Sequence, residues 1–268
     1  IKTGYSPYQN EKNNVTKVLV TGMSGLIGGL LQTYLSGVDD YILTALNRRE
    51  VPGIHTYQSD ISDLESIIPA FKGQDVVVHL AANLSSSKFE DLLPANLIGT
   101  YNVYEAARLS GVKRVVFASS GSTIRGFEKI HPYSEIATGN YENVPSEYRK
   151  VSHKDIRPAD IYGATKVWGE ALGRHFSESH DMSILCVRIG SVTKQNKPLE
   201  TRQQSIYLSH RDACQILKLC IEAPDRLRYD IFFATSDNKW NYRDISRSKT
   251  VLGYTPEDSA DNKLCERS

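Results

Sequence analysis

The chain has 268 residues, of which 40% are hydrophobic and 24% are charged, and its formal net charge is +1. These proportions are typical of a globular protein that buries one large core or two small ones. The near-neutral charge predicts no nucleic-acid partner. No apolar run approaches the roughly 20 residues of a bilayer span, so no membrane partner is predicted either.

The sequence also predicts a reducing, cytoplasmic location. Residues 1–14 are polar and carry no charged segment that leads into an apolar one, so no signal peptide is expected. The four cysteines show no C-x-x-C spacing and the seven histidines no H-x-x-x-H spacing. We therefore expect buried free thiols and predict no metal site.

The first predicted elements form a strand, a glycine-spaced turn and a helix. Residues 18–20 are apolar, and apolar periodicity over 26–35 indicates the helix. Gly22 allows the tight turn, Gly25 lets backbone N–H groups approach a pyrophosphate, and Gly28 lets the helix pack closely on the strand. Glycines with this spacing can also mark a turn alone. The residues expected to contact a dinucleotide here are Gly22, Ser24, Gly25, Leu26, Ile27 and Gly28.

A second strand over 41–46 ends at the position where dinucleotide folds select their cofactor. A carboxylate there binds the ribose hydroxyls of NAD, whereas a nearby arginine accommodates the 2′-phosphate of NADP. Asn47 stands at the acid position, and Arg48 and Arg49 follow it. The pattern therefore favours NADP over NAD, with a solvated loop as the alternative interpretation of the arginines.

A helix over 63–71 and a buried strand over 75–82 come next, after a short extended segment that ends at Asp60. The strand ends in small residues, which leave room for adenosine or ribose at the sheet edge. His79 lies inside the apolar run of this strand. We interpret it as a hydrogen-bonded core histidine.

The middle of the chain alternates helices with continuous apolar strands. A long helix carries Asn96, a strand over 115–118 follows, and helical periodicity over 160–180 precedes a strand over 184–189. Strands of this kind indicate a parallel sheet that is covered on both faces. The segment 127–158 is polar, rich in tyrosine and interrupted by proline. It is predicted to be a long excursion over the active-site face, with room for one short helix.

Regularity weakens after residue 190. A helix over 211–223, a strand over 230–234 and a short helix that ends near 252 are predicted. This part is too small for an independent domain. We expect residues 1–190 to form an NAD(P)-binding domain and residues 191–268 to form a small substrate lid packed on it.

Tyr162 and Lys166 lie four residues apart near the start of the helix over 160–180, and therefore on one helical face. A nearby ammonium stabilises a phenolate and lowers the pKa of a tyrosine from about 10 towards neutrality. Tyr162 is then able to exchange a proton at working pH. Lys166 can also hold the ribose hydroxyls of a nicotinamide cofactor.

Taken in order, these motifs resemble the extended short-chain dehydrogenase/reductases, the NAD-dependent epimerase/dehydratase family. The matching residues are Thr21–Gly28 as T-G-x-x-G-x-x-G, Asp60, Leu80-Ala81-Ala82, Asn96 in N-x-x-G, Ser119-Ser120, and Tyr162-x-x-x-Lys166. The resemblance implies a Rossmann-type doubly wound α/β fold with a parallel sheet and a small C-terminal substrate-binding region.

The resemblance also implies residue roles. Tyr162 is expected to be the acid/base, Lys166 the pKa-lowering and ribose-binding residue, and Ser120 the donor to the reacting oxygen. Ser122 and Thr123 lie close enough to replace Ser120. The further cofactor contacts implied are Asp60, Ile61, Leu80, Ala81, Ala82, Asn96 and Ile189.

Within the family, the chain is most similar to uronate dehydrogenases, above all at Val187-Arg188-Ile189-Gly190-Ser191. Arg188 is a candidate for binding a sugar carboxylate, because guanidinium binds carboxylate bidentately. A structural ion pair at a strand end is the alternative. The expected substrate contacts are Ser85, Ser120, Gly121, Ser122, Tyr162 and Arg188.

The chain also departs from those relatives. Gly121-Ser122 stands where they carry Asn-His, Leu84 replaces a polar residue, the second strand lacks their acid, and 127–158 is longer. The reaction type therefore transfers more safely than the substrate.

We expect hydride transfer between a nicotinamide cofactor, NAD or NADP, and a sugar or sugar acid. Two alternatives remain: an epimerase, dehydratase or reductase that acts on a nucleotide sugar and recycles its cofactor, and a non-catalytic binder that senses redox state. The family resemblance also implies a homodimer, formed through the helices that carry Asn96 and Tyr162.

Overall fold

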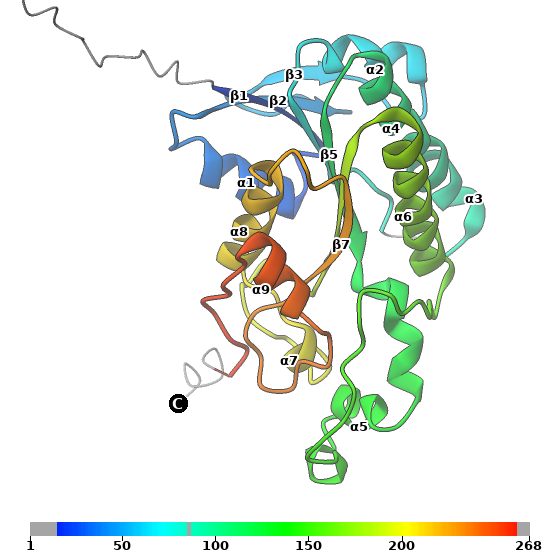
Figure 1. Cartoon of the computed structure of the whole chain (residues 1–268), viewed down its shortest axis with the longest axis vertical. Coiled ribbons are helices and arrows are strands. Elements are labelled where there is room, and N and C mark those ends of the chain that lie inside the picture. The colour runs from blue at the N-terminus through cyan, green and yellow to red at the C-terminus, as the bar shows by residue number, and fades with distance from the viewer. Residues whose placement is uncertain (1–14, 85–86, 262–268) are drawn as a thin grey trace, which may run out of the picture.

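The computed structural model describes residues 15–84 and 87–261, which fold around one parallel sheet (Figure 1). The strand order is β3-β2-β1-β4-β5-β6-β7, and every neighbouring pair is parallel. The order reverses between β1 and β4, as it does in a doubly wound sheet. The predicted fold class is confirmed. The strands are β1 (Thr16–Thr21), β2 (Tyr41–Asn47), β3 (His55–Gln58), β4 (Val76–His79), β5 (Arg114–Ser120), β6 (Ser183–Ile189) and β7 (Tyr229–Ala234).

Helices cover both faces of the sheet, as Figure 1 shows. One face carries α1 (Leu26–Leu35), α8 (His210–Ile221) and α9 (Ser246–Leu252). The other carries α2 (Leu64–Phe71), α4 (Gly99–Leu109) and α6 (Ile161–His180). None of these helices, nor any other in the described ranges, has both the length and the apolar character needed to cross a membrane.

The continuous apolar strands are explained by these two layers. In β1, Val18 and Val20 pack into the core beneath α1 and α8, whereas Leu19 packs into the core beneath α2 and α4. Successive side chains of a strand point to opposite faces, so a strand that is buried on both faces needs apolar residues throughout. All three side chains are fully buried.

The long helix predicted around Asn96 is in fact three consecutive segments. A short α3 (Phe89–Leu92) leads into a π-helical turn, η1 (Leu93–Ile98), and then into α4. Pro94 lies at the start of that turn. π-Helical turns are often found at functional sites, and this one carries Asn96.

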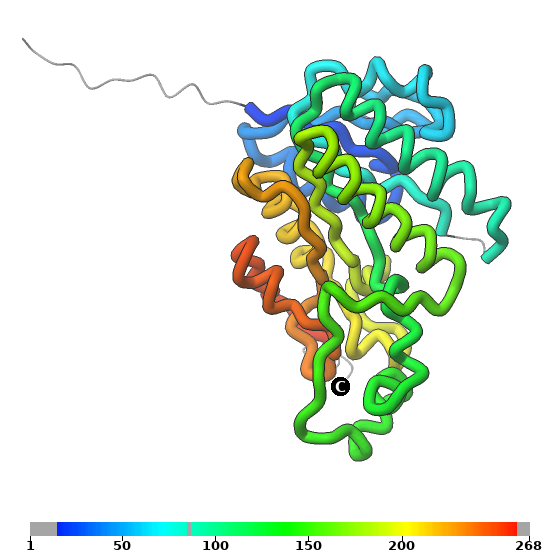
Figure 2. The backbone as a smooth tube through the Cα atoms, turned by 45° about the vertical axis from the view of Figure 1, so that its right-hand side comes forward, coloured from blue at the N-terminus to red at the C-terminus, as the bar shows by residue number. Residues whose placement is uncertain are grey.

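The excursion 127–158 is ordered and contains more helix than expected. It begins within the 3₁₀ segment η2 (Gly121–Lys129) and contains α5 (Tyr133–Thr138) and a second 3₁₀ turn, η3 (Tyr141–Asn143). Another short helix that the sequence did not predict, α7 (Gln203–Ile206), lies in the C-terminal part. The excursion, α7 and residues 235–245 lie together at one end of the molecule (Figure 2).

A third apolar core joins these two segments. Tyr133 of α5 packs with Tyr242, and Tyr141 stacks on Trp240 with 4.2 Å between the ring centroids. Val151 also pairs with Arg243 in a parallel β-bridge. The excursion is therefore held in place by residues about 90 to 110 positions further along the chain.

The C-terminal part differs from the lid that the sequence predicted. β7 is the last strand of the same sheet, and α8 packs against α1 and covers that sheet. A boundary at residue 190 therefore does not separate the sheet from a lid. Within the described C-terminal residues, α7 and residues 235–245 pack with the excursion.

We predict that Gly28→Ala destabilises the protein by about 1–3 kcal/mol, because an overpacked site forces the backbone to shift. A Cβ at this position would lie 2.5 Å from the Cα of Met23. Gly29→Ala is the matched control, since a Cβ there meets nothing within 4 Å and alanine favours a helix. Urea denaturation of both variants measures the difference. Equal stabilities would contradict this account of the close packing.

Candidate active site

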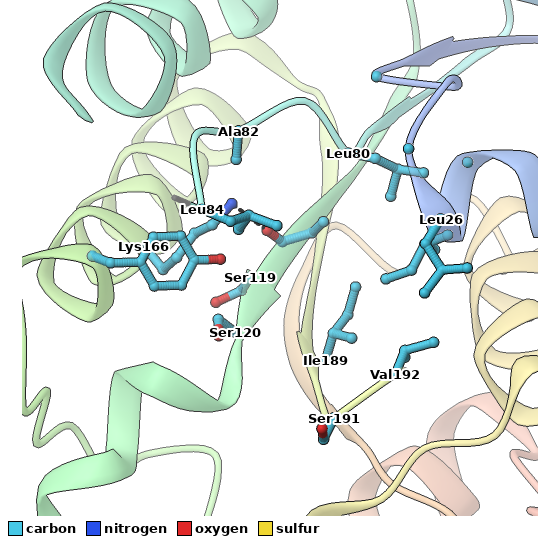
Figure 3. Close-up of a pocket in the computed structure, with 17 residues that line it drawn as sticks. Leu26, Leu80, Ala82, Leu84, Ser119, Ser120, Lys166, Ile189, Ser191 and Val192 are labelled. Atoms are coloured by element: carbon cyan, nitrogen blue, oxygen red, sulfur yellow. Dashed lines mark hydrogen bonds between the residues drawn. The ribbon is translucent and has the colours of Figure 1, made fainter. Parts of the chain in front are cut away.

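A cavity of about 400 Å³ lies at the carboxyl edge of the sheet, beside the point where the strand order reverses (Figure 3). It is bordered by the β1–α1 turn, the ends of β4, β5 and β6, and the start of α6. Ligands of open α/β sheets bind at this position. The predicted site residues that line it are Gly22, Gly25, Leu26, Ile27, Gly28, Leu80, Ala82, Ser120, Tyr162, Lys166 and Ile189.

The turn between β1 and α1 fits a dinucleotide phosphate. Gly22 has a φ of +72°, and a Cβ there would come within 2.8 Å of the Ala81 backbone. Gly25 is the N-cap of α1 and makes no side-chain cap, which leaves the first N–H groups of the helix for a ligand. A dinucleotide pyrophosphate requires close backbone approach and free donors at a helix N-terminus. Both features are present.

The start of α6 places Tyr162 opposite Ser120. The Asp160 side chain caps the helix by accepting a hydrogen bond from the Gly163 N–H at 2.7 Å. Gly163 itself packs so closely on η2 that a Cβ would lie 2.5 Å from the Ser122 carbonyl oxygen. Tyr162 and Ser120 both line the cavity, and the Ser120 hydroxyl acts to lower the pKa of the Tyr162 phenol. The end of β5 and the first turn of α6 thus supply the pair together.

Burial is the largest cause of the pKa shifts of Tyr162 and Lys166. It raises the pKa of Tyr162 to about 12, although the hydrogen bond with Ser120 acts in the opposite direction. Burial also lowers the pKa of Lys166 to about 8. The expectation that Lys166 lowers the pKa of Tyr162 is not met, since the groups that affect this pKa are Ser120 and Asp160. The Lys166 ammonium instead donates to the carbonyl oxygen of Ala118 at 2.7 Å.

The neighbouring hydroxyls have other partners. Ser119 donates to the carboxylate of Glu170, and Thr123 donates to the Ser120 carbonyl. The backbone N–H of Ser122 donates to the Ser120 hydroxyl oxygen at 3.1 Å. Of Ser120, Ser122 and Thr123, Ser120 is the one that lines the cavity and affects the pKa of Tyr162.

Asn96 and His79 are buried behind the site. The Asn96 side chain accepts from the Asn83 N–H at 2.7 Å and donates to the Thr165 hydroxyl at 3.3 Å, so it ties the loop after β4 to α6. His79 hydrogen-bonds Thr21, and burial lowers its pKa to about 3. His79 is a core histidine, as predicted. Neither residue lines the cavity.

Three residues predicted to bind the adenosine end of the cofactor lie outside the cavity lining, namely Asn47, Arg48 and Asp60. Asn47 is buried, and its amide hydrogen-bonds the Ser24 hydroxyl and the Arg49 carbonyl. Arg48 is exposed beside Asp60, whose pKa is lowered by hydrogen bonds from Ser62 and by Arg48.

Ile61 and Ser85 were also predicted to contact the cofactor and the substrate. The Ile61 side chain is buried in the core against Gly99, so a cofactor contact would be limited to its backbone. Ser85 lies outside the described residues.

The structure contradicts the expectation that Arg188 binds a substrate carboxylate. Its guanidinium is fully buried and forms two hydrogen bonds to Glu170, both 2.8 Å long. A third nitrogen donates to the Asp155 carbonyl at 2.9 Å. With these donors already committed to the protein, Arg188 is a structural ion pair between β6 and α6.

Sequence reasoning missed several lining residues and one buried cation. The lining residues missed are Leu84, Ala118, Ser119, Gly190, Ser191 and Val192. Most follow the ends of strands that were predicted, and carboxyl ends of parallel strands meet at one edge, so that rule would have found them. The buried cation is Arg243, packed against Gly121, and no local pattern marks it.

Comparison with known proteins agrees with this geometry. A model of the NAD dependent epimerase/dehydratase family matches residues 18–207. An NAD-dependent glucose-6-phosphate dehydrogenase from Haloferax volcanii is 31% identical over 252 residues, which are 91% of this chain and 94% of the relative. An L-arabinose 1-dehydrogenase (NAD(P)(+)) from the same organism is 30% identical, covering 92% and 98%. A uronate dehydrogenase mutant from Agrobacterium tumefaciens, crystallised with NAD, has a TM-score of 0.78 at 28% identity, over 94% and 88% of the two chains.

We predict that Arg188→Leu lowers the free energy of unfolding by about 3–5 kcal/mol, because it leaves the Glu170 carboxylate buried without its partner. The double variant with Glu170→Leu is expected to recover much of that loss. Chemical denaturation measures all three proteins. A stable Arg188→Leu variant that only binds sugar acids more weakly would restore the substrate-binding role.

Proposed function

The chain belongs to the NAD dependent epimerase/dehydratase family, and from that premise we propose that it is an NAD(P)-dependent dehydrogenase of a sugar or sugar acid. The observation that carries the proposal is the meeting of Ser120, Tyr162 and Lys166 around the cavity that the glycine-rich turn also borders. A reacting hydroxyl and a nicotinamide need to share one site, and this cavity offers groups for both.

Tyr162, Ser120 and Lys166 have separate roles in the proposed reaction. Bound NAD(P) supplies the hydride acceptor, or the donor in the reverse direction. In its phenolate form, Tyr162 takes the hydroxyl proton of the substrate, and Ser120 hydrogen-bonds the same oxygen as its charge develops. Lys166 stays protonated below about pH 8 and provides the positive charge on the same helical face as Tyr162. Because the pKa of Tyr162 is high, its phenolate needs this positive charge in order to form at neutral pH.

We propose NADP as the preferred cofactor. Asn47 ends β2 without a negative charge, and Arg48 and Arg49 are both exposed directly after it. A 2′-phosphate is repelled by a carboxylate at this position and bound by a guanidinium.

We also propose a homodimer in a reducing compartment. α4 and α6 lie side by side on one face (Figure 1). Tyr101, Leu109 and Ile161 are exposed on these two helices, at 44%, 52% and 39%. Such a face suits a second copy of the chain. The buried free thiols of Cys186, Cys214 and Cys220 suit a reducing compartment.

We predict that Tyr162→Phe lowers turnover by about 10²- to 10⁴-fold while NAD(P) affinity stays within a few-fold, because the variant loses the proton acceptor but keeps the ring. Absorbance of reduced cofactor is followed with galacturonate, glucose, glucose 6-phosphate and arabinose. Tyr101→Phe, on the exposed face of α4, is the control. Unchanged turnover in Tyr162→Phe would refute the mechanism. Nicotinamide that copurifies and does not exchange would favour an epimerase.

For the cofactor, we predict that Arg48→Ala lowers kcat/KM for NADP⁺ by about 10- to 100-fold, the size expected for a lost hydrogen bond to a charged group. The value for NAD⁺ should change much less. Asn47→Asp should shift preference towards NAD⁺. Equal effects of either variant on both cofactors would argue for the solvated-loop interpretation.

A further inference from the structure

Arg243 has a buried guanidinium that lies over the Tyr242 ring but forms no ion pair among the described residues. Its side chain is 1% exposed, and its Nε and Nη1 atoms are buried without any hydrogen-bond partner among the described residues. The backbone is held firmly, since the bridge to Val151 and the hydrogen bond from the Arg243 N–H to Asn241 fix this position. The guanidinium therefore occupies a defined place beneath the surface.

The other buried arginines of the described residues are paired. Arg188 binds Glu170 and a backbone carbonyl. Arg114 donates to the Ser183 hydroxyl and to two backbone carbonyls. Burying a cation without such partners costs several kcal/mol, and proteins normally avoid it. The exception at Arg243 therefore calls for a partner from outside the chain.

The guanidinium lies against the turn that carries Ser120. A Cβ on Gly121 would stand 2.1 Å from Nη2 of Arg243, so the cation fits here because position 121 has no side chain. Gly121 directly follows Ser120, and the next residue, Ser122, supports the first turn of α6. Arg243 thus lies next to the backbone that holds Ser120 against Tyr162.

The surrounding charges do not neutralise Arg243. Glu128 is the acid that faces it, but Glu128 already accepts two hydrogen bonds from Arg202, at 2.6 and 2.8 Å, and one from Tyr242. Burial raises the pKa of Glu128, yet Arg202, Tyr242 and Arg243 together hold it below its usual value. One carboxylate therefore faces two guanidinium groups, and a positive charge is left over beside the active site.

We propose that Arg243 binds the anionic group of the substrate, a carboxylate or a phosphate, while the sugar hydroxyl lies between Ser120 and Tyr162. A guanidinium matches both anions, because its N–H donors pair with two oxygens at once. The anion supplies the missing partner of Arg243, and the absent side chain of Gly121 leaves the guanidinium room beside the substrate. This inference rests on the proposed sugar dehydrogenase function and names its substrate class.

The test compares anionic with neutral sugars. kcat and KM are measured for galacturonate, glucose 6-phosphate, glucose and arabinose with wild type, Arg243→Met and Arg243→Lys. We expect Arg243→Met to lower the ratio of kcat/KM for the anionic over the neutral sugars by about 100-fold or more, since a charged hydrogen-bonded pair loses one member. Arg243→Lys should retain part of the ratio. Arg211→Met, which removes an exposed charge on α8, is the matched control.

The two anionic sugars distinguish the source of the charge. Preference for galacturonate identifies a carboxylate, and preference for glucose 6-phosphate identifies a phosphate. An equal loss on neutral and anionic sugars, with the ratio unchanged, overturns the inference. If Arg243→Met does not fold by circular dichroism, Arg243→Gln serves instead. It removes the charge and keeps a polar side chain, so the same selective loss is expected.

Binding without turnover separates this inference from the proposed function. Isothermal titration calorimetry of NADP⁺-loaded protein is run with galacturonate and with inorganic phosphate. Binding of either anion that disappears in Arg243→Met supports the inference, even if wild type oxidises no sugar and the dehydrogenase proposal fails. Oxidation of neutral sugars by a wild type that binds neither anion overturns the inference and leaves the dehydrogenase proposal intact.

Discussion

The buried ion pair between Arg188 and Glu170 sets the position of the helix that carries the proposed chemistry. Glu170 lies four residues after Lys166 and eight after Tyr162, so all three share one stripe of α6. Arg188 holds that stripe against β6, and Ser119 holds it against β5. The rotation of α6 about its axis is therefore fixed by a buried ion pair and a hydrogen bond from Ser119. Arg188, which the sequence suggested as a carboxylate-binding residue, instead positions α6 through its ion pair with Glu170.

The same burial that fixes α6 also determines the electrostatics of the cavity. It opposes charge on both Tyr162 and Lys166, raising one pKa and lowering the other. A low local polarity also strengthens every charge interaction that does form. The resting site thus disfavours the ionised tyrosine. Compensation has to come from cations at short range, and Lys166 is tied to the Ala118 carbonyl by a single hydrogen bond.

Much of the fold was predictable because the determining signals are local. Apolar runs gave the strands, glycine spacing gave the β1–α1 turn, and the Asp160 cap begins α6 where periodicity resumes. No local sequence signal predicts the π-helical turn at Leu93–Ile98, because its residues fit an ordinary helix equally well. The role of Arg188 depends on Glu170, eighteen residues earlier, and that of Arg243 on Gly121. Long-range pairings of this kind cannot be read from spacing within one element.

The bridge between Val151 and Arg243 has a consequence for the order of folding. The sheet up to β6 contains its own crossovers and can grow as the chain emerges, but the excursion has to wait for residues near 240 before its apolar core closes. Contacts between distant segments form late, because the loop between them must first be ordered. The β1–α1 turn and the strands around it can therefore form before this third apolar core. Until that core closes, its tyrosines and Trp240 are exposed surfaces that favour aggregation.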